Sequence, residues 1–336
     1  MATLITVGGS ASTGTGTTFG DLIQKVYRRL MGGLRERTVQ LNGAVTDTQD
    51  TIVVSGAQAG SIAPGVIFSV ELELMYVISW DSATNTATVI RGYYGSVASN
   101  HVDNVVIYLN PRYSHYDIGV AINDDLRSLS SPGNGLFRVG VAELTYNPVF
   151  QGYDLGALPS NFIDILEVRY KIAPPYRTFP PIKRWKVVRW NTQSTDAAFP
   201  SGNGLIVYEP GWPGLPIFVT YSAPFIPLVE LSDSLTDTPA GNDTYGAPHN
   251  GYKNTTIPNL TGTMVDIPPL GAEIDLTQPR EISRNFMESQ PDPRKAQEVT
   301  AGSVAGSVNA LVARRMQRIN EEASRLQRQY TRLKGW

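Results

Sequence analysis

Residues that could do chemistry are few in this chain, and they do not cluster along the sequence. The three histidines, His101, His115 and His249, lie in different segments with no carboxylate at metal-ligand spacing, and there is no cysteine. Metal sites and nucleophilic triads need such residues within reach of one another. The sequence therefore favours no metal site and no cofactor, and we expect a protein that is not an enzyme.

Two pairs of carboxylates could still act as an acid and a base: Glu71 with Glu73, and Asp124 with Asp125. Neighbouring helical residues point in different directions, and isolated carboxylates are usually exposed. We therefore interpret both pairs as ordinary surface charges. By similar reasoning, His101 and the histidine that follows Ser114 are predicted to be structural or solvent-exposed.

The glycine-rich opening of the chain superficially matches phosphate-binding loops. A Walker loop needs lysine after its last glycine, but Thr15 follows Gly14. The dinucleotide-binding pattern needs glycine where Phe19 stands. Both patterns fail at the residue that carries the chemistry, so nucleotide binding is not expected.

Composition allows a large core but gives little indication of a partner. The chain has 336 residues, 41% of them hydrophobic, and a formal net charge of -2. No run of about 18 apolar residues predicts a membrane span, no signal peptide is recognisable, and the lack of cysteine fits a reducing cytoplasm. The charge is uneven, because Arg280 to Trp336 holds 11 basic and 6 acidic residues.

The clearest pattern is a single long helix predicted from Asp292, a capping residue, to Trp336. Within it, apolar residues recur at alternating steps of four and three, which is the heptad pattern of helices that pack against one another. We call this set the seam; its members are Val312, Met316, Ile319, Ala323, Leu326, Tyr330 and Leu333.

Small residues in the first half of this helix allow close packing. Gly302 and Gly306 weaken an isolated helix but let another backbone approach. They could mark a kink or an intrachain contact, or equally a contact between subunits. For the second case, the predicted subunit-packing residues are Gly302, Gly306, Val312, Ile319 and Leu326.

Basic residues accumulate along the same helix. The six arginines are Arg314, Arg315, Arg318, Arg325, Arg328 and Arg332, against only Glu321 and Glu322 after residue 313. They could form a solvated helix face, with Glu321 and Arg325 as an i,i+4 pair. They could instead contact a partner.

The rest of the chain predicts an α+β fold. Helices are expected over Phe19–Met31 and from the Ser114 cap to about Leu129, with six short strands between them that favour a small barrel or sandwich. The predicted organisation is an extended arm at 1–17, a small helical bundle from 18–34, 111–135 and 265–336 with the long C-terminal helix, the β-barrel-like module at 35–110, an irregular β domain at 136–230, and a long flexible loop at 231–264.

Several short motifs add a resemblance to this outline. The stretches Thr18–Leu30 and Tyr116–Leu126, and the sequence Leu158-Pro159-Ser160-Asn161-Phe162, resemble the two helices and the β-domain entry of tailed-bacteriophage head-to-tail adaptor proteins, also called connector or head completion proteins. Glu73 to Val77, then Arg91 to Ser96 and His101, are similar to a small β module that recurs in phage structural proteins. The 35–110 module is larger than compact adaptors carry.

The resemblance implies a structural virion protein. Such adaptors form a ring, usually a dodecamer, which joins the portal protein to tail, stopper or other neck proteins. DNA passes through the lumen during ejection. The implied location is the virion neck between capsid and tail, after assembly in the host cytoplasm. On this interpretation the six arginines contact the portal or, without sequence specificity, the packaged DNA; no membrane contact is expected.

An alternative function remains open from the sequence. Modules rich in aromatic residues, such as the 16 tyrosines and 5 tryptophans here, also bind surface sugars in tail-tip and receptor-binding proteins. That alternative predicts a trimer with an outward aromatic patch. A basic heptad helix at the C-terminus is unusual for such a protein.

Overall fold

A computed structural model describes residues 18–145, 152–170, 179–189, 199–209, 216–227, 260, 263–288 and 303–330. These residues fall into two compact units. The barrel unit draws on Gly16–Leu126 and Ile226–Gln317, and the sheet unit on Arg127–Phe225 and Arg318–Trp336. Two helices cross the boundary between the units, so each contributes residues to both.

Helix α1, Phe19–Met31, has the predicted bounds, because its sequence contains both end signals. Thr18 and Asp21 form a reciprocal capping box at the N-terminus, and Gly32 ends the helix in the left-handed conformation. The buried residues are spaced as an amphipathic helix requires and include Phe19, Leu22, Ile23, Val26 and Met31.

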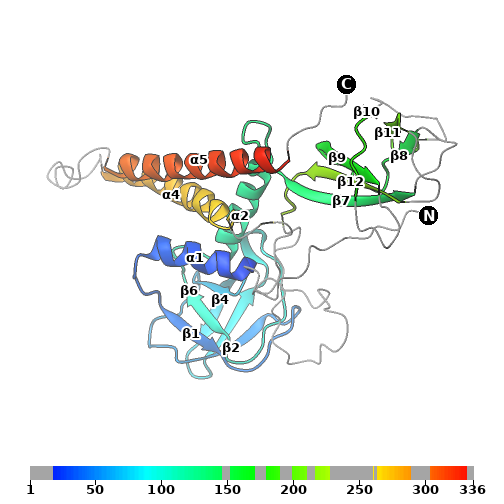
Figure 1. Ribbon diagram of the computed structural model, residues 1–336. Helices are drawn as coiled ribbons and strands as arrows, with labels where there is room; N and C mark the ends of the chain where they lie inside the picture. Colours follow the sequence, from blue (N-terminus) through cyan, green and yellow to red (C-terminus); the bar gives the residue numbers. More distant parts are fainter. Residues whose placement is uncertain are drawn as a thin grey trace. The chain divides into compact units, whose positions relative to one another are not determined.

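Three further helices accompany α1 in Figure 1. Helix α2 is His115–Leu129, and the Ser114 hydroxyl accepts a hydrogen bond from the Asp117 amide at 3.0 Å, as the predicted cap requires. The sequence also predicts a helix from about Leu270 to Glu288, interrupted or begun again near Pro279. The observed helix α4, Ile267–Glu288, begins three residues earlier and is unbroken. Helix α5 is Ser303–Gln329.

The six strands predicted between α1 and α2 form a closed barrel (Figure 1). Around the barrel the order is β1-β2-β5-β4-β3-β6, and β6 pairs with β1 to close it. The strands are β1 Thr38–Leu41, β2 Thr51–Ser55, β3 Ile67–Val70, β4 Glu73–Asp81, β5 Thr86–Ile90 and β6 Val106–Leu109. Closure leaves no unpaired sheet edge, which suits a small module of short strands.

The barrel interior is filled by side chains that alternate along the strands. Ile52 and Val54 of β2, and Val77 of β4, are at most 1% exposed. Phe68 is the largest side chain of this core. Because 14 buried hydrophobic residues share one cluster, the barrel has a core of its own.

The sheet unit contains two three-stranded antiparallel sheets, with the orders β7-β12-β9 and β10-β11-β8. The sequence predicts five of the six strands, over Phe137–Tyr146, Ile163–Tyr170, Trp185–Trp190, Leu205–Tyr208 and Ile217–Tyr221. The three-residue β8 was missed, because so short a strand has no periodic pattern. A register shift lies between Thr220 and Tyr221 of β12. The strands are β7 Arg138–Thr145, β8 Gly152–Asp154, β9 Asp164–Tyr170, β10 Trp185–Arg189, β11 Asn203–Val207 and β12 Pro216–Ala223.

One turn of the predicted β-domain entry contributes to the core of the sheet unit. Leu158 and Phe162 are both buried, and the Phe162 amide donates to the Pro159 carbonyl at 3.0 Å. Their cluster includes Val168 and Val219, which are fully buried on the paired strands β9 and β12. The turn therefore anchors β9 against its own sheet.

Mixed helices and sheets with one closed barrel confirm the predicted α+β class. The arm at 1–17, nearly all of the 231–264 loop, and the parts of the predicted long helix at 292–302 and 331–336 lie outside the described residues. Among the residues described, no helix is long and apolar enough to cross a membrane.

Candidate functional site

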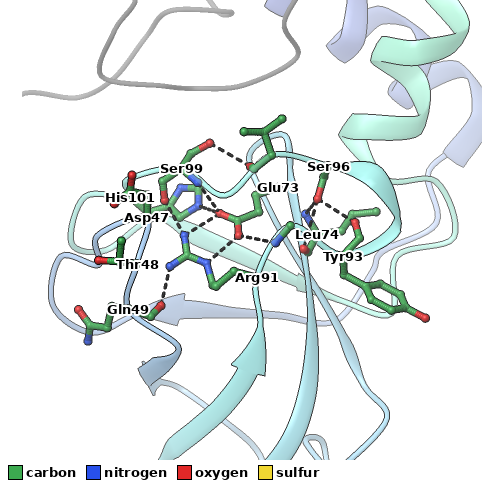
Figure 2. Close-up of polar contacts among 12 residues, drawn as sticks. Asp47, Thr48, Gln49, Glu73, Leu74, Arg91, Tyr93, Ser96, Ser99 and His101 are labelled. Atoms are coloured by element: carbon green, nitrogen blue, oxygen red, sulfur yellow. Dashed lines mark hydrogen bonds and ion pairs between the residues drawn. The ribbon is translucent and has the colours of Figure 1, made fainter.

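The barrel contains a network of buried charged side chains centred on Glu73 (Figure 2). Its carboxylate accepts two hydrogen bonds from the Arg91 guanidinium, at 2.6 and 2.7 Å. The amides of Gly92 and Ser99 donate to the same carboxylate at 3.1 and 3.0 Å. The Glu73 side chain is 0% exposed, so these contacts replace its entire hydration.

His101 completes this network between two carboxylates. Its Nε2 lies 2.8 Å from Glu73 Oε2, and its Nδ1 lies 3.1 Å from Glu71 Oε2. Both ring nitrogens can donate to carboxylates at once only in the imidazolium form. The two acids, the arginine and a protonated histidine then have no net charge, which is what burial requires.

The pKa values follow from the same contacts. Burial by itself lowers the pKa of His101, but hydrogen bonds to Glu71 and Glu73, and their charges, outweigh it and raise the pKa above the usual value. Burial raises the pKa of Glu73, but the hydrogen bonds from Arg91 and His101 outweigh that effect and hold it below the usual range. Each partner therefore favours the charged form of the other.

The network joins segments that are distant in the sequence. Arg91 donates to the carbonyls of Thr46 and Gln49, at 2.6 and 2.7 Å, and to that of Ser99. His101 also pairs through its backbone with Val45. The loop before β2 and the loop before β6 are thus tied to β4, and the chemistry of this site is structural.

This arrangement overturns one interpretation from the sequence and decides between two others. Glu71 and Glu73 are buried rather than ordinary surface carboxylates, and His101, predicted to be structural or solvent-exposed, is 2% exposed and structural. The missed signal was their spacing: β4 begins at Glu73, and an acidic residue at an inward position requires a buried cation. Arg91, which follows the neighbouring strand β5, supplies it.

Asp125 was also misinterpreted as a surface charge. It is 4% exposed on α2, and its Oδ1 lies 2.6 Å from Arg315 Nη2 of α5. Helix α4 passes so close to it that a Cβ on Gly271 would lie 1.8 Å from Asp125 Oδ1. Three helices of the barrel unit therefore meet at one buried ion pair.

A second ion pair connects α1 with α4. Arg29 Nη1 lies 2.7 Å from Glu273 Oε1, and the Glu273 side chain is 7% exposed. Burial raises the pKa of Glu273, which the charges of Arg29, Lys25 and Arg314 oppose. Lys25 has a lowered pKa because it is partly buried and lies near Arg29.

The seam of α5 divides into an exposed and a buried part. Val312 and Met316 are 40% and 45% exposed, whereas Ile319 and Leu326 are 1% and 5% exposed. Ile319 and Leu326 are thus covered by this chain itself. Of the seam residues predicted to contact another subunit, Val312 therefore remains exposed, and Met316 lies exposed one turn after it. Gly306 is exposed with open space around it, and Gly302 lies outside the described residues.

The six arginines predicted to contact a partner also differ in their exposure and in their contacts within the chain. Arg315 is paired with Asp125, and the buried Glu322 is held by Arg318 and Arg325, with its closest contact 2.7 Å from Arg325 Nε. Arg314 and Arg328 are exposed, and Arg332 lies outside the described residues. Arg315, Arg318 and Arg325 therefore have acidic partners in the described part of the chain.

One cavity of the sheet unit, of about 580 Å³, has no acidic or basic side chain among its lining residues. It is lined by apolar and hydroxyl side chains, among them Leu136, Phe137 and Tyr330, and by the amide of Gln327. In the described part of the chain, no group of three or more His, Cys, Asp or Glu side chains could hold a metal ion. No family model and no curated protein matches this sequence.

Proposed function

We propose that this protein is a head-to-tail adaptor of a tailed bacteriophage, a structural virion protein without catalytic activity. Its copies form a ring, of twelve subunits by the resemblance, that joins the portal protein to the tail or neck proteins. DNA passes through the lumen of this ring. In this proposal the helices form a small bundle with α5 as its longest member.

The observation that carries the proposal is that the residues of one quoted motif contact one another in the structure. Glu73, Arg91, Gly92, Ser99 and His101 are joined by hydrogen bonds in one buried network. All but Ser99 belong to the residues on which the resemblance to phage structural modules was based. A network built from the side chains of Glu73, Arg91 and His101 and the backbone amide of Gly92 gives the resemblance a structural reason.

The seam supports the ring. Val312 and Met316 continue the apolar repeat of α5 beyond the part that the chain itself covers. An apolar stripe of this kind is stabilised when a neighbour covers it, and head-to-tail contacts between identical copies close into a ring when the rotation fits. Burying two such side chains would contribute about 1.5–3 kcal/mol each per subunit contact if they became fully covered.

The predicted portal contact rests on the exposed arginines of α5. Arg314 and Arg328 are exposed on it, whereas Arg315 is paired with Asp125. Arg314→Glu or Arg328→Glu is expected to weaken docking to purified portal rings. Lys186→Glu, a charge reversal of the same size at an exposed position of β10, is the matched control. Docking unchanged by all of these variants would remove α5 from the portal interface.

One observation favours the alternative, a tail-tip or receptor-binding protein. Tyr94 is 77% exposed, its ring lies 6.1 Å from that of Tyr93, and Tyr93 lies 5.2 Å from Tyr76. Ile90, which pairs with Tyr76 across β4 and β5, is 49% exposed. Adjacent aromatic rings on a barrel surface could bind sugars.

Electron microscopy of particles separates the two functions. We would label purified virions with a gold-tagged antibody against this chain. The adaptor proposal expects label at the neck between capsid and tail. Label at the distal tip would reject the adaptor and support the receptor-binding protein, and particles without label would reject both.

A further inference from the structure

A group of exposed arginines lies in the barrel unit, away from the sequence segment that was predicted to be basic. Arg35 and Arg37 occupy the segment between α1 and β1, and Arg112 follows β6. Pairing of β1 with β6 brings these two segments together: the Leu109 amide donates to the Arg37 carbonyl at 2.9 Å. The three side chains are exposed.

Glu36 fixes the geometry of this group. Its Oε1 accepts a hydrogen bond from the Arg112 amide at 2.6 Å, and its Oε2 accepts one from the Tyr27 hydroxyl at 2.9 Å. The carboxylate thus ties the arginine segments to α1, where Arg28 lies next to Tyr27. We call Arg28, Arg35, Arg37 and Arg112 the arginine patch.

The four positive charges of the patch exceed the one negative charge of Glu36. None of the four arginines forms an ion pair with any residue in the described part of the chain, whereas Arg315, Arg318 and Arg325 of α5 do. The guanidinium carbon of Arg112 lies over the ring of Tyr113, 5.8 Å from the ring centroid, in a cation–π arrangement. Exposed arginines on adjoining segments, four against the one carboxylate of Glu36, are suited to an anionic partner.

We propose that the arginine patch binds the phosphate backbone of duplex DNA. Guanidinium groups bind phosphate through paired hydrogen bonds, and such contacts need no apolar centre. A protein partner usually does need one. Within 28–37 and 110–113 the only large exposed apolar side chain is Leu34, so DNA is favoured over an acidic protein.

As a statement about DNA in the lumen, this inference rests on the proposed ring, but the binding itself can be measured on the purified chain. The affinity for a short fluorescent duplex would be measured by anisotropy over a series of salt concentrations. The test variant carries Arg35→Gln, Arg37→Gln and Arg112→Gln. A matched variant, the α5 variant, carries Arg314→Gln, Arg328→Gln and Arg332→Gln, which removes the same charge from α5 and the residues that follow it.

Each phosphate neutralised contributes about 0.9 to the slope of log affinity against log salt, so three lost contacts should reduce the slope by about 2.7. We expect this reduction for the patch variant and a slope close to that of the unmodified chain for the α5 variant. Lysine at the same three patch positions should restore most of the slope, because the charge returns. The thermal unfolding midpoint of each variant serves as the control for folding.

Three results would overturn the proposal: an unchanged slope in the patch variant, an equal or larger loss in the α5 variant, or no binding by the unmodified chain at low salt. Loss of portal docking by the patch variant with unchanged DNA affinity would assign the patch to an acidic protein instead. Gold label at the neck with failed DNA binding rejects only this inference. Label elsewhere with patch-dependent DNA binding rejects only the adaptor.

Discussion

Two groups of charged side chains in the barrel unit have opposite environments. In the buried network, Glu73 and Arg91 are at most 8% exposed and fully hydrogen-bonded. In the arginine patch, Arg35 and Arg37 are exposed and have no ion-pair partner among the residues described. The comparison separates charges that hold the fold from charges that remain available to a partner.

The largest effect is expected from breaking the buried network. Glu73→Gln removes the charge that both Arg91 and His101 need, and leaves two cations buried together. Removing one partner of a buried ion pair typically costs about 3–5 kcal/mol. Denaturant unfolding followed by the fluorescence of Trp80, which packs against the barrel core, measures the loss.

Asp47→Asn is the matched control for this change. Asp47 lies in a loop that the network holds, but its carboxylate is exposed and only its backbone amide is hydrogen-bonded, to Asn100 at 2.9 Å. We expect no resolvable change in unfolding. If Glu73→Gln and Asp47→Asn lowered the free energy of unfolding equally, the buried network would stabilise the barrel no more than an exposed charge does.

Two glycines in helices distinguish a tightly packed position from an open one. Gly271→Ala places a methyl group against Asp125, so it should destabilise the barrel unit by about 1–3 kcal/mol. Gly306→Ala meets nothing within 4 Å and should stabilise α5 by up to about 1 kcal/mol. Thermal unfolding of both variants measures the difference, and equal effects would refute the close approach at Gly271.

The same pair bears on a prediction made from the sequence. Gly306 was predicted to mark either a kink or intrachain contact or a contact between subunits, and no described residue fills the space beside it. If Gly306→Ala stabilises the isolated chain but prevents ring assembly, the glycine serves the neighbour. If rings still assemble with Gly306→Ala, the glycine has no role in subunit contact and only weakens the helix.

Local patterns carried most of the fold prediction, because caps, alternation and turn residues are short-range signals. The bounds of α1 and the number of barrel strands follow from such signals, and β8 was missed for lack of one. Glu73 and Arg91 were quoted in one motif, but their contact depends on neighbouring strands. The sequence around Glu73 or around Arg91 does not by itself show which strands are neighbours, so this contact could not be predicted from it.

A smaller and pH-dependent effect is expected from His101. Its pKa is raised in the folded state above the usual 6.5, so its stabilising contribution is complete below that value and is lost as pH rises through the folded pKa. The opposite sign holds for Glu73, whose lowered pKa makes its contribution decline as pH falls below 4.5. Each unit of pKa shift corresponds to about 1.4 kcal/mol.

Comparing the unmodified chain with His101→Gln isolates the histidine. Unfolding midpoints of both chains would be measured from acidic to alkaline pH, and their difference should shrink on the alkaline side. Tyrosines that titrate at high pH affect both chains and cancel. A constant difference across this range would mean that His101 does not change its charge, and that its two carboxylate contacts include a shared proton instead.

The smallest effect on stability is expected at the exposed part of the seam. Met316→Glu should change the free energy of unfolding by less than about 0.5 kcal/mol, because its side chain already contacts water. Ile319→Glu, one turn later, places a charge at a position that is 1% exposed and should unfold the sheet unit. Native mass spectrometry on the folded Met316 variant then tests assembly. Rings that form as well as those of the unmodified chain would show that the exposed seam faces solvent, not another subunit, and the ring proposal would lose its support from α5.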